Sequence, residues 1–370
     1  MQKKRIVFHT ASLRGGGAER VFVLMANELA ARGHDVTLFT WNASGPNGAL
    51  LSPAVKLIDL DIPLRGEGYG KPGTFRGLRG SIAMLRRIRP DVVYSAPEFA
   101  NLLMALALIV TGSRARFYPS FHAAASLPTN ELGSRIAVIL SALTLRRAAK
   151  AIAVSKGVGR DVAARGMPDS KVVVINNPLP QGIGRRAASY PWERELAAMG
   201  PGPVIASAGW MVPVKDHRTL IAAFARLRAL RPARLVIFGY GPLEDELRAY
   251  ARELGVADSM LLPGYVNDPA ACHAVADVFV LTSTSEGFGN VLIEAMGAGV
   301  PVVSTDAPHG PREILADGRY GTLVPVGDAQ ALAKAIDATL DRPLAAETLK
   351  ARAADFDPRK IGDLYEALLA

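Results

Sequence analysis

An α/β protein built from two Rossmann-like, doubly wound domains is the fold that this sequence predicts, and three observations predict it. The chain has 370 residues, enough for two domains that each bury their own core. Short apolar runs alternate with amphipathic stretches of helical period, and Gly-rich loops lie between them. The pattern starts afresh at residue 204, after a stretch rich in Pro, Gly and Arg at 178–203. We therefore expect one domain over residues 1–185 and another over residues 186–356.

The first half of the chain opens with a βαβ unit. We expect a strand at 5–8, a loop with three glycines at 15–17, a helix at 18–32 that ends at Gly33, and a strand at 35–39. Three glycines alone are weak evidence of function, because a plain turn between strand and helix also uses them. Further strands are predicted at 90–94, 116–121, 149–154 and 172–175.

A basic amphipathic helix is predicted from about Phe75 to Arg89. Its apolar side chains share one stripe, and arginines border that stripe. Such a helix is either an exposed face of a doubly wound domain or an interfacial contact with anionic lipid, and the sequence leaves both open. The apolar residues are Leu78, Ile82, Leu85 and Ile88, and the basic residues are Arg76, Arg79, Arg86, Arg87 and Arg89.

The second half repeats the alternation of strands and helices. After the strand at 234–238, the turn from Gly239 to Pro242 looks like half of a dinucleotide fingerprint. Glu244 stands where the third glycine would be needed, so a nicotinamide cofactor is poorly supported. The other strands are predicted at 204–208, 260–264, 278–281 and 302–306.

The stretch from residue 278 to residue 303 carries the most specific signal. We expect Asn290 to cap a helix that begins at Val291, directly after a buried strand and a Gly-rich loop. The amide groups and the dipole of such a helix start attract phosphate. Glu286 lies in the loop, and Glu294, just over one turn into the helix, can accept two hydrogen bonds from a vicinal diol. A phosphate with a sugar on either side fits this arrangement, although a plain βαβ unit with solvated glutamates is the alternative.

The distribution of charge points to an anionic partner for the first half. The formal net charge is +9, but residues 1–180 hold 24 Lys and Arg against 11 Asp and Glu, whereas the remaining residues hold 19 against 23. Phospholipid headgroups, a pyrophosphate-linked acceptor and nucleic acid are the candidate partners, and solubility alone is the plainer explanation. Nucleic acid ranks last, because aromatic residues make up only 6% and no known nucleic-acid-binding motif is found.

Composition favours a cytoplasmic protein, soluble or peripheral at a membrane. With 49% apolar and 21% charged residues, the chain is ordinary for a globular protein, and disorder is excluded. No signal peptide is expected, and the longest apolar run, 102–110, falls short of the roughly 20 residues of a spanning helix. Cys272 is the single cysteine, which excludes a disulfide framework within the chain.

The spacing of the two glutamates carries a resemblance to a known family. Glu286, seven residues and Glu294, within SEGFGNVLIEAMGAGVPVV, resemble the signature of the family 4 glycosyltransferases, and GGAERV at 16–21 resembles the start of many members. The resemblance covers nearly the whole chain. It implies the GT-B fold, in which two Rossmann-like domains face a central cleft: an acceptor-binding N-terminal domain and a nucleotide-sugar-binding C-terminal domain, with a last helix, here 357–370, that packs back onto the first.

The resemblance also implies which residues form the site. Glu286, Lys215 and His122 are the expected catalytic residues, and His122 occupies the strand end where members place a histidine that hydrogen-bonds the donor sugar. Gly16 and Gly17 are expected to approach the donor phosphates and the acceptor. The other expected donor-binding residues are Trp210, Gly239, Gly241, Tyr265, Val266, Gly287, Phe288, Gly289, Asn290, Val291, Glu294 and Arg312.

One position departs from the pattern of the family. Members commonly carry an arginine and a lysine after the strand at 204–208, and both side chains contact the donor diphosphate. Lys215 is kept, but Trp210 replaces the arginine, which removes a bidentate phosphate donor. His309 and Arg312 lie in a segment that resembles relatives of lipid-linked glycan and surface polysaccharide assembly. We expect both to face the donor, and Arg312 to supply the missing charge.

The function implied is retaining transfer of a hexosyl or N-acetylhexosaminyl group from a nucleotide sugar, expected to be a UDP-sugar, to a lipid-linked or surface-glycan acceptor. No cofactor and no metal are expected, because the D-x-D strings at Asp59 and Asp355 lie away from the Gly-rich loops and the histidines have no ligand spacing. Two alternatives stay open: a nucleotide-sugar epimerase or phosphorylase of the same architecture, and a nucleotide-sugar-binding regulator without catalysis.

Overall fold

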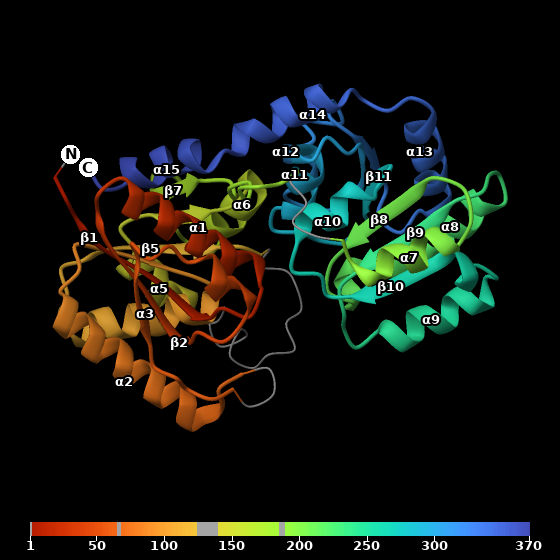
Figure 1. The fold of residues 1–370 in the computed structure, drawn as a ribbon. Helices are drawn as coiled ribbons and strands as arrows, with labels where there is room; N and C mark the ends of the chain where they lie inside the picture. The colour runs from red at the N-terminus through yellow and green to blue at the C-terminus, as the bar shows by residue number, and fades with distance from the viewer. Residues whose placement is uncertain (1, 65–67, 124–139, 185–188) are drawn as a thin grey trace. The chain divides into compact units, whose positions relative to one another are not determined.

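The chain folds into two compact units. The structure, a computed structural model, describes residues 2–64, 68–123, 140–184 and 189–370. Unit 1 comprises Met1–Pro178 together with Pro358–Ala370, and unit 2 comprises Leu179–Asp357 (Figure 1). The division therefore falls after Pro178, a few residues before the expected boundary at 185, and the C-terminal helix belongs to unit 1.

Unit 1 is built on a parallel sheet. Within the described residues it has seven strands, in the order β3-β2-β1-β4-β5-β6-β7. All of the strand pairs are parallel, and Ile6 of β1 lies opposite both Val36 of β2 and Val92 of β4. The strands are β1 (Arg5–Ser12), β2 (Asp35–Asn42), β3 (Lys56–Asp59), β4 (Val92–Ser95), β5 (Arg116–Phe121), β6 (Ala151–Ala153) and β7 (Val172–Val174).

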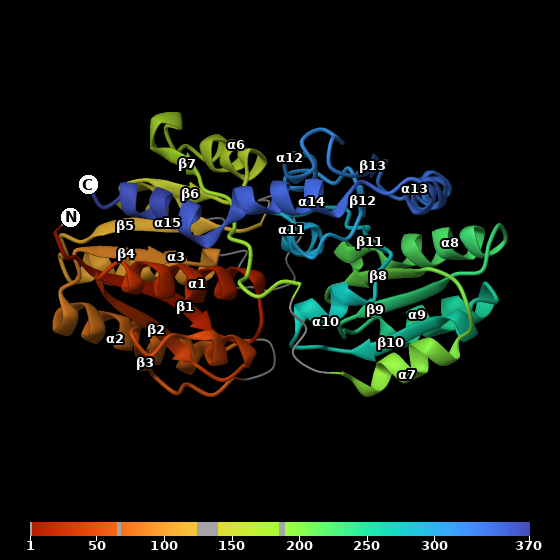
Figure 2. The same cartoon turned by 45° about the horizontal axis from the view of Figure 1, so that its top comes forward.

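Helices cover both faces of this sheet, which is why its central strands are buried along most of their length. Figure 1 shows α2 and α3 over one face, and Figure 2 shows α15 lying along α1. The α-helices are α1 (Gly17–Ala31), α2 (Gly70–Ile88), α3 (Glu98–Val110), α5 (Ser141–Arg147), α6 (Lys156–Ala164) and α15 (Pro358–Ala367), and the 3-10 turns are Pro46–Leu50 and Asp169–Lys171.

The C-terminal helix is fixed to unit 1 by buried hydrogen bonds and by an ion-pair network. The Tyr94 hydroxyl donates to the carbonyl of Tyr365 at 3.0 Å, and the Tyr118 hydroxyl donates to the carbonyl of Leu368 at 2.6 Å. Arg32 of α1 pairs with Glu366 at 2.6 Å and with Asp363, also on α15. Because these side chains leave few polar groups unpaired at the contact, α15 forms part of the unit 1 core and is not a loose tail.

Unit 2 repeats the architecture. Its six described strands have the order β10-β9-β8-β11-β12-β13, and every pair is parallel. The strands are β8 (Val204–Ala208), β9 (Arg234–Phe238), β10 (Met260–Gly264), β11 (Val278–Leu281), β12 (Val302–Thr305) and β13 (Thr322–Val324). The α-helices are α7 (Pro191–Ala198), α8 (His217–Arg228), α9 (Glu244–Glu253), α10 (Pro269–Ala274), α11 (Asn290–Gly297), α12 (Pro311–Ile314), α13 (Ala329–Asp341) and α14 (Ala346–Ala353), and the 3-10 turns are Pro213–Lys215, Ala257–Ser259 and Ala354–Phe356.

The strand orders place a topological switch point in each unit. The sheet of unit 2 grows from β8 in one direction through β9 and β10, and in the other through β11 and β12. Ligands of open α/β sheets bind at such a point, outside the carboxyl ends of the strands. The loops that follow β8 and β11 are therefore the parts of unit 2 that the fold places for binding.

The basic helix differs from its prediction. It begins at Gly70 rather than near Phe75, and small residues, not Leu78 and Ile82, form the centre of its buried face. Trp41 explains this, because a Cβ atom on Gly77 would lie 2.4 Å from its ring. The helix approaches the sheet through glycine, so Leu78 and Ile82 are only half-buried and its side toward solvent is strongly basic.

Several predicted bounds also needed correction. Gly289, with a φ of 101°, is the N-cap of α11, and the helix begins at Asn290 rather than at Val291. The first two strands run on to Ser12 and Asn42, and the supposed linker at 178–203 contains α7. Across the described residues, none of the helices is both long enough and apolar enough to span a bilayer.

Candidate functional site in two sheets

An ion pair joins the two loops at the switch point of unit 2. The Lys215 ammonium lies 2.5 Å from Oε1 of Glu286, and the Ser283 hydroxyl donates to the same oxygen at 2.7 Å. The two charged side chains are 25% and 12% exposed, so the pair is largely shielded from water. These residues stand 71 positions apart in the sequence and are brought together because β8 and β11 are neighbours.

Backbone hydrogen bonds hold the same two loops in register. The amide of Thr284 donates to the carbonyl of Val214 at 2.8 Å, and the Thr282 hydroxyl donates to the carbonyl of Lys215 at 2.9 Å. Asp216, with a φ of 44°, caps α8 by accepting from the amide of Thr219. The ammonium of Lys215 is therefore positioned by the fold and is not a mobile surface charge.

Glu294 lies just over one turn into α11 and is almost completely buried. Its Oε2 is 3.7 Å from Nε2 of His273, which lies on α10 and is itself 1% exposed. The neighbouring thiol of Cys272 has its pKa raised, first by burial and then by the charge of Glu294. The two oxygens of a carboxylate can together accept several hydrogen bonds, and burial makes such bonds more valuable than they are in water. His273 was not among the site residues expected from the sequence, and no sequence motif indicates its position beside Glu294.

Three aromatic side chains mark the carboxyl ends of three adjacent strands. Trp210, Tyr240 and Tyr265 follow β8, β9 and β10 in that order, and each is about half exposed. Their rings meet edge to face, with centroids 6.2 Å apart for Trp210 and Tyr240 and 6.3 Å apart for Tyr240 and Tyr265. Tyr240 was not among the expected site residues, although it stands between Gly239 and Gly241. Such exposed rings offer a surface on which a flat base can stack.

The glycines of this region permit close approach of the chain. A Cβ atom on Gly239 would lie 2.0 Å from the carbonyl oxygen of Gly209, so only glycine brings the turn after β9 this close to the turn after β8. A Cβ atom on Gly241 would likewise lie 2.6 Å from the carbonyl oxygen of Met211. This packing brings the strand ends that carry Trp210 and Tyr240 together.

Arg312 is engaged within unit 2. Its guanidinium forms a bidentate pair with Asp306 and a longer contact of 3.4 Å with Asp317, while the side chain is 56% exposed. To supply charge to a diphosphate, Arg312 would have to leave or share these carboxylates. His309, in the loop before α12, adopts a φ of 71°.

The expected residues of unit 1 lie at the carboxyl ends of β1 and β5. His122 directly follows β5, and its Nε2 lies 2.9 Å from the Ser120 hydroxyl. Its Nδ1 is buried and has no hydrogen-bond partner among the described residues. Burial lowers the pKa of His122 to about 4, so its imidazole is neutral at physiological pH. A neutral ring with an unpaired nitrogen can bind a hydroxyl group.

The glycine loop of unit 1 is occupied by a side chain of its own helix. Glu19 Oε2 accepts from the amides of Gly15 and Gly16, each at 3.1 Å, and its other oxygen accepts from Ser12. Burial raises the pKa of Glu19, against these hydrogen bonds, which lower it. The carboxylate therefore sits where an anion would bind at the start of α1, and Gly17 is the first residue of that helix.

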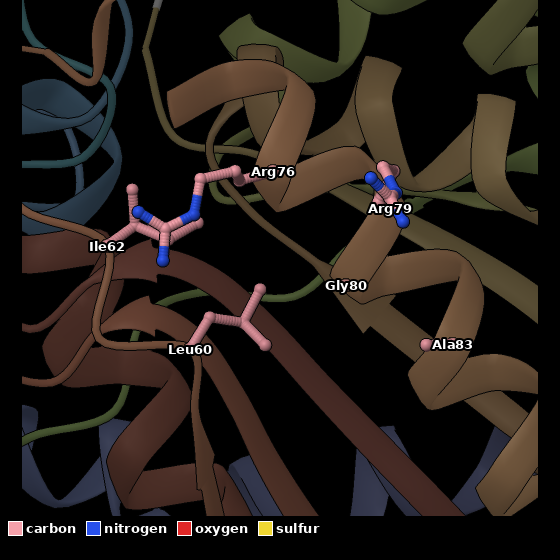
Figure 3. A pocket seen from close by; sticks show the side chains of 6 residues that line it. All are labelled: Leu60, Ile62, Arg76, Arg79, Gly80 and Ala83. Carbon is pink, nitrogen blue, oxygen red and sulfur yellow. The ribbon is translucent and has the colours of Figure 1, made fainter. Parts of the chain in front are cut away.

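The basic side of α2 borders a shallow groove of about 390 Å³. Its lining comes from α2 and from the segment that follows β3. Figure 3 shows the Arg76 guanidinium lying beside Ile62 and above Leu60 in this view, whereas Arg79 lies further along α2, next to Gly80. Phe75, on the same helix, is 61% exposed and has the Arg79 guanidinium near its ring.

Among the described residues, the His, Cys, Asp and Glu side chains form no group of three that could hold a metal ion. Asp59, from one of the D-x-D strings, accepts instead from the amides of Ala43 and Asp61.

Comparison with known proteins agrees with this architecture. Residues 15–180 match the family model described as Glycosyltransferase Family 4, and residues 191–356 match the one described as Glycosyl transferases group 1. The chain is 30% identical, over 376 aligned positions that cover 96% of both proteins, to the lipopolysaccharide core biosynthesis glycosyltransferase LpsE of Rhizobium meliloti.

Two further similarities cover different shares of the chain. A Campylobacter jejuni protein, N-acetylgalactosamine-N,N'-diacetylbacillosaminyl-diphospho-undecaprenol 4-alpha-N-acetylgalactosaminyltransferase, is 37% identical over 161 residues, which are 42% of this chain and 44% of that protein. The crystal structure of Anabaena HepE in complex with UDP-glucose superimposes with a TM-score of 0.80, at 23% identity and over 99% of both chains. The sequence relative that spans the full length and the two matched family models together establish that this chain belongs to the family 4 glycosyltransferases and has their GT-B fold.

Proposed function

We propose that the protein transfers a hexosyl or N-acetylhexosaminyl group from a UDP-sugar to a lipid-linked or surface-glycan acceptor, with retention of configuration at the anomeric carbon. The observation that carries the proposal is the Lys215–Glu286 ion pair beside the start of α11, with the buried Glu294 on the same helix. Relatives support the choice of substrates, because one is named for a diphospho-undecaprenol acceptor, one for lipopolysaccharide core, and HepE was crystallised with UDP-glucose.

Each part of a UDP-sugar has a matching group in unit 2. The buried carboxylate of Glu294 accepts hydrogen bonds from the two ribose hydroxyls, because two adjacent donors suit one carboxylate. Trp210, Tyr240 and Tyr265 provide apolar surface for the base. The ammonium of Lys215 and the dipole at the start of α11 oppose the charge of the diphosphate. Glu286 then lies beside the sugar that the diphosphate carries.

Catalysis in this proposal depends on charge and position. As the bond from the anomeric carbon to the phosphate oxygen breaks, negative charge grows on the diphosphate, and Lys215 stabilises that charge more strongly than it stabilises the ground state. The acceptor hydroxyl attacks from the same face, and the leaving phosphate oxygen takes its proton. His122, neutral because of its low pKa, hydrogen-bonds a sugar hydroxyl without adding charge.

Metal independence is part of the proposal, because Lys215 and α11 supply positive potential where other transferases use a divalent cation. We also propose that unit 1 contacts an anionic membrane surface through the basic side of α2, where the groove of Arg76 and Arg79 and the exposed ring of Phe75 lie together. A lipid-linked acceptor would hold its reacting sugar close to that surface.

The first prediction tests the reaction itself. Incubation with a panel of UDP-sugars should release UDP slowly by hydrolysis, and activity should survive an excess of EDTA. Interconverted sugar would identify an epimerase, a requirement for inorganic phosphate would identify a phosphorylase, and binding without turnover would identify a regulator. Loss of activity in EDTA that only Mn²⁺ restores would refute metal independence.

The second prediction concerns Glu294. Glu294→Gln should weaken UDP binding by about 1–3 kcal/mol, since charge-assisted hydrogen bonds to the ribose are lost while the shape of the side chain is kept. Calorimetry measures the affinity, and thermal unfolding checks that the variant is folded. Glu347→Gln on α14 is the matched control, because this side chain is 85% exposed and pairs with Lys350, and the variant should bind UDP normally. Unchanged affinity in a folded Glu294→Gln variant would remove the assignment.

The third prediction concerns the charge on the diphosphate. Lys215→Ala should lower kcat by about 100-fold or more, because a preorganised cation acting on the developing charge is lost. Arg312→Ala should lower kcat comparably if its guanidinium leaves Asp306 to serve the donor, and should leave kcat unchanged if the pair persists. Steady-state kinetics decide both points, with Lys350→Ala as the control. A near-normal kcat in Lys215→Ala would exclude the role of this lysine.

The fourth prediction concerns the membrane. Wild-type protein should co-sediment with anionic vesicles at low salt and be released at high salt, since each basic residue near the surface contributes on the order of 1 kcal/mol. Arg76→Glu with Arg79→Glu should reduce the bound fraction strongly. Arg226→Glu with Arg252→Glu, on α8 and α9 of unit 2, makes the same change in net charge and should bind as wild type does. Equal binding by both double variants would show that α2 is only a solvated face.

A further inference from the structure

A second cavity in unit 1, of about 700 Å³, lies at the opposite end of the sheet from His122. It opens where β1, β4 and β5 begin, between the last turn of α2 and the segment that follows α3. Its lining is polar and basic over an apolar base, and consists of Arg5, Leu85, Arg86, Arg89, Pro90, Asp91, Thr111, Ser113, Arg114 and Ala115.

The lining carries a marked excess of positive charge. Four arginines face one carboxylate, that of Asp91. Arg5 is already committed, because its guanidinium donates to the carbonyl of Ile88 at 3.2 Å and contacts Asp91 at 3.4 Å. Within the described part of the chain, the guanidinium groups of Arg86, Arg89 and Arg114 make no hydrogen bond or ion pair. Three guanidinium groups around one cavity repel one another unless an anion lies between them.

The simplest structural purpose for Arg114, which follows α3, is already served by other groups. Cations near the C-terminus of a helix usually satisfy its last carbonyls. At the end of α3, however, those carbonyls accept from the backbone amides of Thr111, Gly112 and Ser113. Arg147, which lies outside the cavity lining, donates to the carbonyls of Ser113 and Ala115 beyond the helix.

Arg89 also occupies a position that favours another residue type. It ends α2 in the left-handed region, with a φ of 49° and a ψ of 62°. Glycine is the usual residue there, because a side chain makes this conformation unfavourable. A ligand for its guanidinium would explain why arginine is present.

We propose that this cavity binds a phosphate group with two or more negative charges, carried either by a free diphosphate-containing molecule or by a lipid phosphate. Guanidinium groups bind phosphate oxygens through paired hydrogen bonds, and three of them around one concave site suit a multivalent oxyanion better than a single carboxylate. The Thr111 and Ser113 segment closes one side of the cavity.

The site lies far from the residues proposed for catalysis in unit 1. β5 begins at Arg116, beside the cavity, and ends at Phe121, before His122. At about 3.3 Å per residue, the two ends are separated by roughly 20 Å. The anion therefore takes no part in sugar transfer and serves to anchor or regulate unit 1. This inference does not depend on the proposed function.

Calorimetric titration with inorganic pyrophosphate at low ionic strength tests the site. The titrations use full-length Lys215→Ala protein, which is the parent protein for all variants here, so that the ammonium of Lys215 in unit 2 does not contribute to pyrophosphate binding. Arg89→Gly with Arg114→Ala should weaken binding at least tenfold, and the glycine should leave the melting temperature unchanged or higher because it suits the backbone there. The matched control, Arg87→Ala with Arg146→Ala, loses the same charge outside the cavity and should bind within about threefold of the parent.

Vesicles identify the source of the phosphate. The vesicle assays use the parent protein with Arg76→Glu and Arg79→Glu added, so that the basic side of α2 does not contribute. If phosphatidic acid vesicles bind this protein and phosphatidylcholine vesicles do not, and if binding is lost both on addition of pyrophosphate and on introduction of Arg89→Gly with Arg114→Ala, then the site takes a lipid phosphate. If pyrophosphate binds and the vesicles do not, the site takes a soluble anion. The proposal is overturned if neither probe binds the parent protein, or if the cavity variant and the control variant bind alike.

Discussion

Lys215 and Glu286 come from loops that follow neighbouring parallel strands, and the ion pair between them joins the two halves of the sheet in unit 2. A lysine there without its carboxylate would be a mobile cation, and the carboxylate without its lysine would be a partly buried charge with Ser283 as a weak partner. Because both are held, the ammonium points to a fixed place beside the start of α11. A diphosphate that arrives there meets a preorganised charge and need not order a flexible side chain.

The second carboxylate of this site, that of Glu294, is buried. Glu294 lies in the protein interior beside His273 because α11 packs against α10. Burial of a charged carboxylate is costly, and in the proposed function the hydrogen bonds from the ribose hydroxyls reduce that cost. Unit 1 uses the opposite solution at α1, where Glu19 satisfies the glycine loop from within. The start of α1 in unit 1 is therefore occupied by the carboxylate of Glu19, whereas the start of α11 in unit 2 is flanked by Lys215.

The sequence predicted the strands well, because parallel strands buried on both faces are continuous apolar runs, and β5, β8, β9 and β11 begin and end where expected. Prediction from the sequence failed where contacts between residues distant in the chain determine the local structure. No local sequence pattern indicates that Trp41 packs against Gly77 and so determines which face of α2 is buried. Nor does any local pattern indicate that His273 lies beside Glu294. Helical periodicity predicts the buried face from the positions of apolar side chains. The buried face of α2 carries glycines instead, and it lies close to the sheet because glycine has no side chain. The roles expected of the site residues, among them His122, Lys215, Glu286, Glu294, Gly16, Gly17 and Arg312, all stay predictions.

Trp210 gives the site of unit 2 a different balance of forces from the family pattern. An arginine there would add a bidentate phosphate contact, whereas the indole joins Tyr240 and Tyr265 in an edge-to-face row across three strand ends. Arg312, on α12 after β12, is held by Asp306 and Asp317. In the proposed function, with one arginine replaced by an aromatic ring and another paired with carboxylates, stacking contributes more to the binding of a nucleotide sugar and charge contributes less. Lys215 is then the side chain proposed to stabilise the charge on the leaving diphosphate.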